Sequence, residues 1–176
     1  MFVIHRSIDV DFAHHVRGHA GGCINVHGHT WKFEVGLRAH HLDERGFVTD
    51  FGDLQRRVLD PIHDLLDHSL ALGRQTYEEA EPALCELGQR LLSSRSECSP
   101  VAATPITLAG AETRFPGGMK VAVFPFAPTS ERLAQWLHQL ATGELADGRV
   151  GVAYGRIYET LHPVESIAEY RGPDPG

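Results

Sequence analysis

Two runs near the start of the chain alternate between apolar and polar positions. In the run 2–16, one face of an extended chain carries mainly apolar residues and one histidine, namely Ile8, Val10, Phe12, His14 and Val16. The run 26–37 alternates in the same way, and the glycine-rich residues 18–23 between the runs indicate a loop. Because successive side chains of a strand point to opposite sides, the pattern predicts two antiparallel strands, with His14 on the buried face of the first.

Apolar residues then return at helical spacing. They predict a helix over residues 50–72, with Asp50 or Asp53 as its N-cap. Pro61 predicts a kink or a break in this helix, because a proline inside a helix loses a backbone hydrogen bond and clashes with the preceding turn. A second helix is predicted over residues 77–92.

The rest of the chain completes an α+β pattern. Residues 93–118 are rich in Ser, Pro, Gly and Ala and predict a long loop, whereas residues 120–126 and 149–160 predict strands. Between these strands a helix is predicted over residues 129–140, capped by Thr129. This order of elements predicts helices packed on one face of an antiparallel sheet.

Composition narrows the class of protein. A length of 176 residues, 42% hydrophobic and 22% charged, is typical of one globular domain. The net charge of −7 argues against nucleic-acid or anionic-membrane binding, which both use excess Lys and Arg. Three cysteines argue against a disulfide framework, and the charged N-terminus argues against a signal peptide. We therefore expect a cytoplasmic protein with a small-molecule partner.

Histidines are concentrated early, with eight of the 12 in the first 41 residues. In a strand, His27 and His29 project from the same face, so they can supply two ligands to a zinc ion. His14, on the buried face of the neighbouring strand, is the third expected ligand. His15 is the rival, but it would share a face with Asp11 and Arg17. A pair of surface histidines without a metal is the alternative for the whole motif.

Other residues suggest proton transfer and ligand binding. Cys23 lies four residues before His27, where a nearby cation would favour the thiolate and make it available as a base; an inert buried cysteine is the alternative. Asp67 and His68 form an adjacent pair in which a carboxylate orients an imidazole, although helix surfaces often carry such residues. Glu159 lies in an apolar strand, and a buried carboxylate there would need donors such as the N–H groups of a ligand.

In their order along the chain, these residues resemble the family of 6-pyruvoyltetrahydropterin and 6-carboxytetrahydropterin synthases. The matching residues are His14, Cys23, His27 and His29, Asp50-Phe51, Asp67-His68, the segment from Pro128 to Glu131, and Glu159-Thr160. The resemblance implies the tunnelling fold, in which two helices pack on one face of a four-stranded antiparallel sheet. The resemblance extends over about residues 2–72 and 119–171. It implies a single domain over residues 1–172, with a family-atypical insertion at about 73–118 between the first helix and the third strand.

The resemblance also implies a function. The substrate would be 7,8-dihydroneopterin triphosphate, and the protein a zinc-dependent lyase that makes 6-carboxytetrahydropterin for queuosine biosynthesis. His14, His27 and His29 would bind Zn²⁺, Cys23, Asp67 and His68 would transfer protons, and Glu159, Thr129 and Glu131 would bind substrate. A pyruvoyl-forming or other pterin enzyme and a non-catalytic pterin- or metal-binding protein are the alternatives. Open sheet edges predict a homo-oligomer, a trimer or a hexamer.

Overall fold

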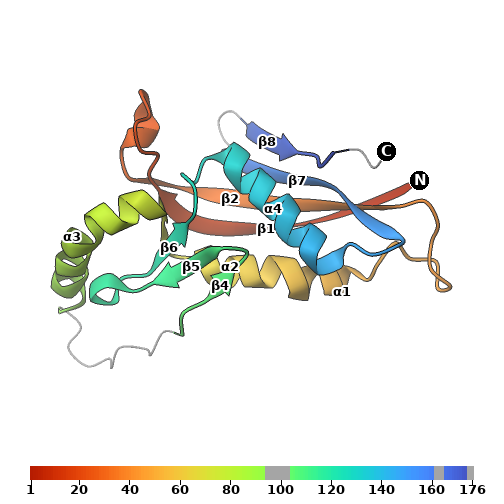
Figure 1. Cartoon of the computed structure of the whole chain (residues 1–176), viewed down its shortest axis with the longest axis horizontal. Coiled ribbons are helices and arrows are strands. Elements are labelled where there is room, and N and C mark those ends of the chain that lie inside the picture. Colours follow the sequence, from red (N-terminus) through yellow and green to blue (C-terminus); the bar gives the residue numbers. More distant parts are fainter. Residues whose placement is uncertain (94–103, 161–164, 174–176) are drawn as a thin grey trace. The chain divides into compact units, whose positions relative to one another are not determined.

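The computed structural model describes residues 1–93, 104–160 and 165–173 (Figure 1). The chain forms two compact units. Unit 1 comprises Met1–Val10, His29–Asp64 and Thr129–Gly176, and unit 2 comprises Asp11–Gly28 and Leu65–Pro128. No helix in the described ranges combines the length and the apolar character that a membrane span requires.

The regular elements alternate between strands and helices. In chain order they are β1 (Phe2–His14), the 3₁₀ turn η1 (Gly22–Ile24), β2 (His27–Ala39), α1 (Phe51–Leu54), the π-helical segment η2 (Gln55–Leu59), α2 (Asp60–Leu66), β3 (Leu70–Gly73), α3 (Arg74–Leu92), β4 (Thr107–Leu108), β5 (Ala111–Arg114), the 3₁₀ turn η3 (Pro116–Gly118), β6 (Val121–Phe124), α4 (Ser130–Leu145), β7 (Val150–Thr160) and β8 (Ser166–Tyr170). The α+β class predicted from the sequence is confirmed.

The predicted four-stranded antiparallel sheet is wrong in strand number and direction. Hydrogen bonding joins eight strands in the order β4-β5-β6-β3-β1-β2-β7-β8. Within unit 2, β3 pairs parallel with both β1 and β6. Four strands were not predicted, and each spans only two to five residues: β3, β4, β5 and β8. Runs this short do not show the alternation that distinguishes a strand from a loop or a helix end.

The helix predicted over residues 50–72 ends at Leu66. Asp50 is its N-cap, because its side chain accepts a hydrogen bond from the backbone N–H of Gly52. The irregularity predicted at Pro61 lies just before it, where the run is divided into α1 and α2 without leaving helical structure. The preceding turn widens into η2, in which the N–H of Asp60 donates to the carbonyl of Gln55, five residues back. With α3 and α4, the described residues contain three long helical segments, at the three places where the sequence predicts helices, whereas the resemblance to the family implied two.

In unit 1, helix α4 packs against strand β7 (Figure 1). A glycine on the strand permits this close approach, because a Cβ at Gly155 would lie 2.6 Å from the carbonyl oxygen of Ala134. Strand β2 pairs antiparallel with β7, and Phe33 and Ile157, both fully buried, face each other in this register. This packing fixes the strand that carries Glu159.

A buried polar cluster also lies in unit 1. Glu34, which is 7% exposed, accepts hydrogen bonds from Arg156 at 2.7 Å, from the Tyr154 hydroxyl at 3.1 Å and from the Tyr158 hydroxyl at 3.4 Å. Arg156 also binds Glu169 of strand β8. Burial, reinforced by the charge of Glu34, raises the pKa of Tyr154 to about 12. The cluster links β2, β7 and β8 through charge-assisted hydrogen bonds.

In unit 2, the region predicted as an insertion contains regular structure. Residues predicted as a long loop form the antiparallel β4–β5 hairpin and the turn η3, while residues 94–103 of that prediction lie outside the described residues. Helix α3 approaches η3 closely at Gly88, where a Cβ would lie 2.6 Å from the carbonyl oxygen of Pro116. Strands β3 and β6 pair from Leu70 and Val121 to Gly73 and Phe124. The segment is therefore a packed part of unit 2.

Candidate metal centre

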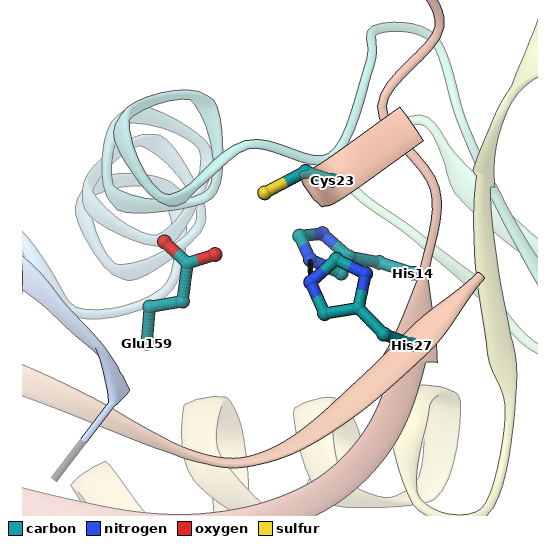
Figure 2. Close-up of side chains that lie close together, drawn as sticks. All are labelled: His14, Cys23, His27 and Glu159. Atoms are coloured by element: carbon teal, nitrogen blue, oxygen red, sulfur yellow. Dashed lines mark hydrogen bonds between the residues drawn. The ribbon is translucent and has the colours of Figure 1, made fainter. Parts of the chain in front are cut away.

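Two histidines of unit 2 face each other at the ends of strands. His14 is the last residue of β1 and is only 1% exposed, and His27 is the first residue of β2. Their Nε2 atoms lie 3.1 Å apart, and their ring centroids are separated by 4.5 Å. Figure 2 shows the two imidazole rings side by side. The prediction that His14 lies on the buried face of the first strand agrees with this placement.

The other ring nitrogen of each histidine contacts a backbone carbonyl. His14 Nδ1 lies 2.9 Å from the oxygen of Pro128, and His27 Nδ1 lies 2.9 Å from the oxygen of Asn25. Because a carbonyl oxygen can only accept, both Nδ1 atoms carry the proton and donate it. When both rings are neutral, their Nε2 lone pairs face each other, and a proton or a metal ion between them would satisfy both.

This arrangement fits a metal ion. Two nitrogen ligands at about 2.0–2.1 Å from a tetrahedral zinc lie roughly 3.3 Å apart, close to the separation of the two Nε2 atoms. In metal sites, the second ring nitrogen of a histidine ligand is usually fixed by a carbonyl or a carboxylate. Pro128 and Asn25 have this role here, and side-chain patterns could not reveal it because both contacts are made by the backbone.

Cys23 completes the cluster in unit 2. It lies in the turn η1, and its carbonyl accepts a hydrogen bond of 2.9 Å from the N–H of Val16. Its Sγ and the ring nitrogens of His14 and His27 all lie within 4.8 Å of one another (Figure 2). Imidazole and thiolate are both common ligands of transition metals, so this cluster can bind a metal ion. The cluster contains His14 and His27, whereas His15 and the third predicted ligand, His29, are not part of it.

Unit 1 holds two further predicted site residues. His29 Nε2 lies 3.9 Å from Glu159 Oε1, and their side chains are 24% and 20% exposed. The His29 ring meets the Trp31 ring edge-on, with centroids 5.4 Å apart. Both side chains are therefore largely, but not fully, shielded from water.

The segment after β6 contributes in two ways. The Pro128 carbonyl orients His14, as described above, and the side chain of Thr129 accepts a hydrogen bond from the N–H of Arg132 and so caps α4. The cap predicted at Thr129 is confirmed. Glu131 lies exposed in the first turn of α4.

Asp67 and His68 form a hydrogen-bonded pair in unit 2. Asp67 Oδ2 accepts from His68 Nδ1 at 2.7 Å, and the His68 side chain is 83% exposed. His68 has φ of +57°, a left-handed conformation that a helix end usually gives to glycine. Its N–H donates to the Asp11 carbonyl at 2.9 Å, which helps to hold this conformation. A strained histidine oriented by a carboxylate is typical of a functional position.

Comparisons with known proteins identify the family. A family model described as "6-pyruvoyl tetrahydropterin synthase" matches residues 3–173. Curated relatives named "6-carboxy-5,6,7,8-tetrahydropterin synthase" come from Haemophilus influenzae, 34% identical over 86 residues, and Rickettsia bellii, 31% identical over 86 residues. The matches cover 47% and 49% of this chain, and about three fifths of the relatives' own lengths, 61% and 62%.

Solved structures show the same fold. An uncharacterized protein from Wolinella succinogenes matches with a TM-score of 0.68 and 23% identity over 98% of both chains. The 6-pyruvoyl tetrahydropterin synthase of Caenorhabditis elegans matches with a TM-score of 0.56 and 17% identity over 98% of this chain and 96% of its own. Because the family model spans nearly the whole sequence, this chain belongs to the 6-pyruvoyl tetrahydropterin synthase family.

Proposed function

We propose that this protein is a zinc-dependent lyase that converts 7,8-dihydroneopterin triphosphate to 6-carboxy-5,6,7,8-tetrahydropterin, on the route to queuosine. One observation carries the proposal: the Nε2 atoms of His14 and His27 face each other at 3.1 Å with the Cys23 thiol beside them. The curated relatives bear the name of this activity. We take residues 1–172 as one catalytic domain with residues 73–118 as an insertion, and we place the enzyme in the cytoplasm.

The zinc ligands in this proposal are His14, His27 and His29. His27 and His29 are two residues apart in β2, and alternate residues of a strand project from the same face. Three histidines leave one coordination position open, as catalytic zinc sites require. Zinc bound there would polarise oxygen atoms of the substrate side chain and make the adjacent C–H groups more acidic.

The chain's own residues would move the protons. The Cys23 thiolate would remove a proton from the substrate side chain, and the exposed His68 imidazole, oriented by Asp67, would carry the second proton. Triphosphate would leave, and cleavage of a carbon–carbon bond with uptake of one water molecule would give the carboxylate product and release the other two side-chain carbons as acetaldehyde. Two acids or bases in separate positions suit a reaction with two proton transfers.

Glu159 would anchor the pterin ring. An ionised carboxylate accepts hydrogen bonds only, and the amino and N3–H groups of a pterin supply two neighbouring donors. Thr129 and Glu131 would contribute to substrate binding as members of the motif at the start of α4.

We further propose that the protein forms a homo-oligomer, either a trimer or a hexamer of stacked trimers. Strands β4 and β8 are the two edges of the sheet, and their outer backbone groups could pair with a second copy of the chain. Light scattering that shows a monomer at micromolar concentration would contradict this.

Incubation of the zinc-loaded protein with 7,8-dihydroneopterin triphosphate, followed by mass spectrometry, tests the function. The 6-carboxy product, the 6-pyruvoyl product and unreacted substrate differ in mass. We expect the 6-carboxy product together with free triphosphate. If only the pyruvoyl product forms, the protein is a pyruvoyl-forming enzyme instead. Recovery of intact substrate would show that it is not a lyase of this substrate.

A further inference from the structure

Asn25 closes the turn that carries Cys23. Its backbone N–H and its side-chain Nδ2 both donate to the carbonyl oxygen of Gly22, at 3.0 Å and 3.2 Å. The turn spans Gly22–Ile24, so these two bonds close the backbone around the cysteine. An N–H donor in the Asn25 side chain therefore restrains the turn from the outside.

The turn has few other restraints. The loop before it contains Gly18 and Gly21, the turn itself begins at Gly22, and nothing lies within 4 Å of the place where a Cβ would stand at Gly22. Among the described residues, the turn is also held by the Ile24 N–H on the Gly21 carbonyl at 3.3 Å and by the Val16 N–H on the Cys23 carbonyl, and the Gly21 N–H before it donates to His19 Nδ1 at 3.1 Å. Glycine-rich backbone samples many conformations, so each remaining hydrogen bond contributes to fixing the thiol.

Asn25 also contacts the histidine pair. Its carbonyl oxygen accepts the proton of His27 Nδ1 at 2.9 Å, which turns Nε2 of the same ring toward His14. One residue thus restrains the cysteine on one side through its side chain and a metal-site histidine on the other through its backbone.

We infer that Asn25 is a positioning residue whose side chain holds the Cys23 thiol beside the His14–His27 pair. The inference rests on the proposed role of Cys23 as the base. Because the amide of Asn25 touches the Gly22 carbonyl and the carbonyl of Asn25 touches His27, loss of the amide affects the thiol and leaves the imidazole contact in place. The side chain therefore sets the rate of proton removal and leaves metal binding largely unchanged.

Asn25→Asp tests this with almost the same side-chain shape, because a carboxylate cannot donate to the Gly22 carbonyl. Asn25→Ala is the second variant, in case the added charge has its own effect. Ser93→Ala is a matched control, since the Ser93 hydroxyl also donates to a backbone carbonyl, that of Arg90 at 2.8 Å, at the end of α3. Asn25 is exposed, so we expect all three variants to fold.

Three measurements separate the roles. We expect kcat to fall roughly fivefold in both Asn25 variants with KM unchanged, in line with one lost hydrogen bond. Zinc affinity, measured by competition with a chelator, should stay within about twofold. The third readout is the rate at which iodoacetamide alkylates Cys23, measured with and without zinc. In the parent protein and in Ser93→Ala zinc should change this rate, and in the Asn25 variants the change should shrink at least threefold.

The alkylation readout does not need turnover, so it tests the inference even if the proposed lyase reaction fails. Unchanged zinc dependence of alkylation in both Asn25 variants would overturn the inference. A parent protein whose Cys23 alkylation does not respond to zinc would also overturn it, because the thiol would then not lie beside the metal. If zinc affinity and kcat fall together, the Asn25 side chain positions the His27 imidazole and not the Cys23 thiol, which would also overturn the inference.

Discussion

Each unit contains a polar cluster around one buried side chain, Glu34 in unit 1 and His14 in unit 2, and the clusters differ in how well their hydrogen-bond donors and acceptors are matched. In unit 1, the Glu34 carboxylate is surrounded by donors from Arg156, Tyr154 and Tyr158. In unit 2, His14 and His27 present two acceptor nitrogens to each other at 3.1 Å. A cluster with matched donors and acceptors stabilises the protein by itself. Two facing acceptor nitrogens need a proton or a metal ion between them, so the histidine pair, unlike the Glu34 cluster, is suited to binding a cation.

The largest effect is expected at Cys23. Cys23→Ala should lower kcat about 10²–10⁴-fold, the usual contribution of a general base, while zinc stays bound. Cys85→Ala, in helix α3, is the matched control and should have no effect on turnover. Iodoacetamide should label Cys23 faster than Cys85, while Cys98 lies outside the described residues. Loss of zinc from Cys23→Ala would show that the thiol is a ligand.

The adjacent residues His14 and His15 should respond differently to substitution, because only His14 is proposed as a zinc ligand. His14→Ala should weaken zinc binding by more than about 100-fold. Even the loss of a residue that only hydrogen-bonds to a metal ligand typically lowers the affinity about 10–100-fold, and the loss of the ligand itself should cost more. His15→Ala should retain the metal, as it removes a side chain outside the cluster. Zinc content after dialysis, measured by atomic absorption, decides between them. The opposite result would mean that His15 is the ligand, and that lying on the buried face of β1 does not identify the ligand.

In unit 1, a substitution in the cluster around Glu34 should lower the stability of the protein. Arg156→Met leaves the 7% exposed Glu34 carboxylate without its cationic partner, which should lower the free energy of unfolding by about 3 kcal/mol. Urea unfolding followed by circular dichroism measures this loss. Arg45→Met, at an exposed ion pair with Asp43, is the control and should change stability by less than about 1 kcal/mol. Equal losses in both variants would contradict the comparison.

Glu159 should affect binding of the pterin ring. Glu159→Gln keeps the shape but loses a charge-assisted hydrogen bond, which should weaken binding of a pterin ligand by about 1.5–3 kcal/mol. The zinc content should not change. Isothermal titration with a pterin ligand gives the affinity of each protein. If the affinity stays the same, Glu159 has a structural role and the likeness to the family does not extend to this residue.

The smallest effect concerns pH. Burial lowers the pKa of His138 below its usual value, and its Nε2 accepts a hydrogen bond of 3.1 Å from the Gly172 N–H. The neutral form is favoured in the folded state, so its contribution to stability is present above the unfolded pKa, about 6.5, and is lost as pH falls through the lower folded value. Urea unfolding at pH 7.5 and 5.5 should show a smaller difference in His138→Gln than in the parent protein. An identical difference would exclude His138 as a contributor.

Much of the fold and of the site could be predicted where side chains follow a period or a cap. The alternation around Phe12 placed His14 on the buried face, and the helix starts at Asp50 and Thr129 follow from their capping side chains. Strand β3 could not be predicted, because its four residues follow a helix and are apolar without alternation. The Pro128 and Asn25 carbonyls also escaped prediction, since a backbone acceptor exists at every residue and only the fold selects one.

Strands β3 and β6 lie parallel, and this pairing limits how far the chain between them can be shortened. Leu70 pairs with Val121, and Gly73 pairs with Phe124, so the chain leaves β3 at one end and must return to the other end to enter β6. A tight turn cannot make this connection, which needs a crossover of about a dozen residues or more. Helix α3 is part of that crossover. A minimised version of this protein would therefore have to keep a crossover of that length between Gly73 and Val121, even if the rest of the segment were removed.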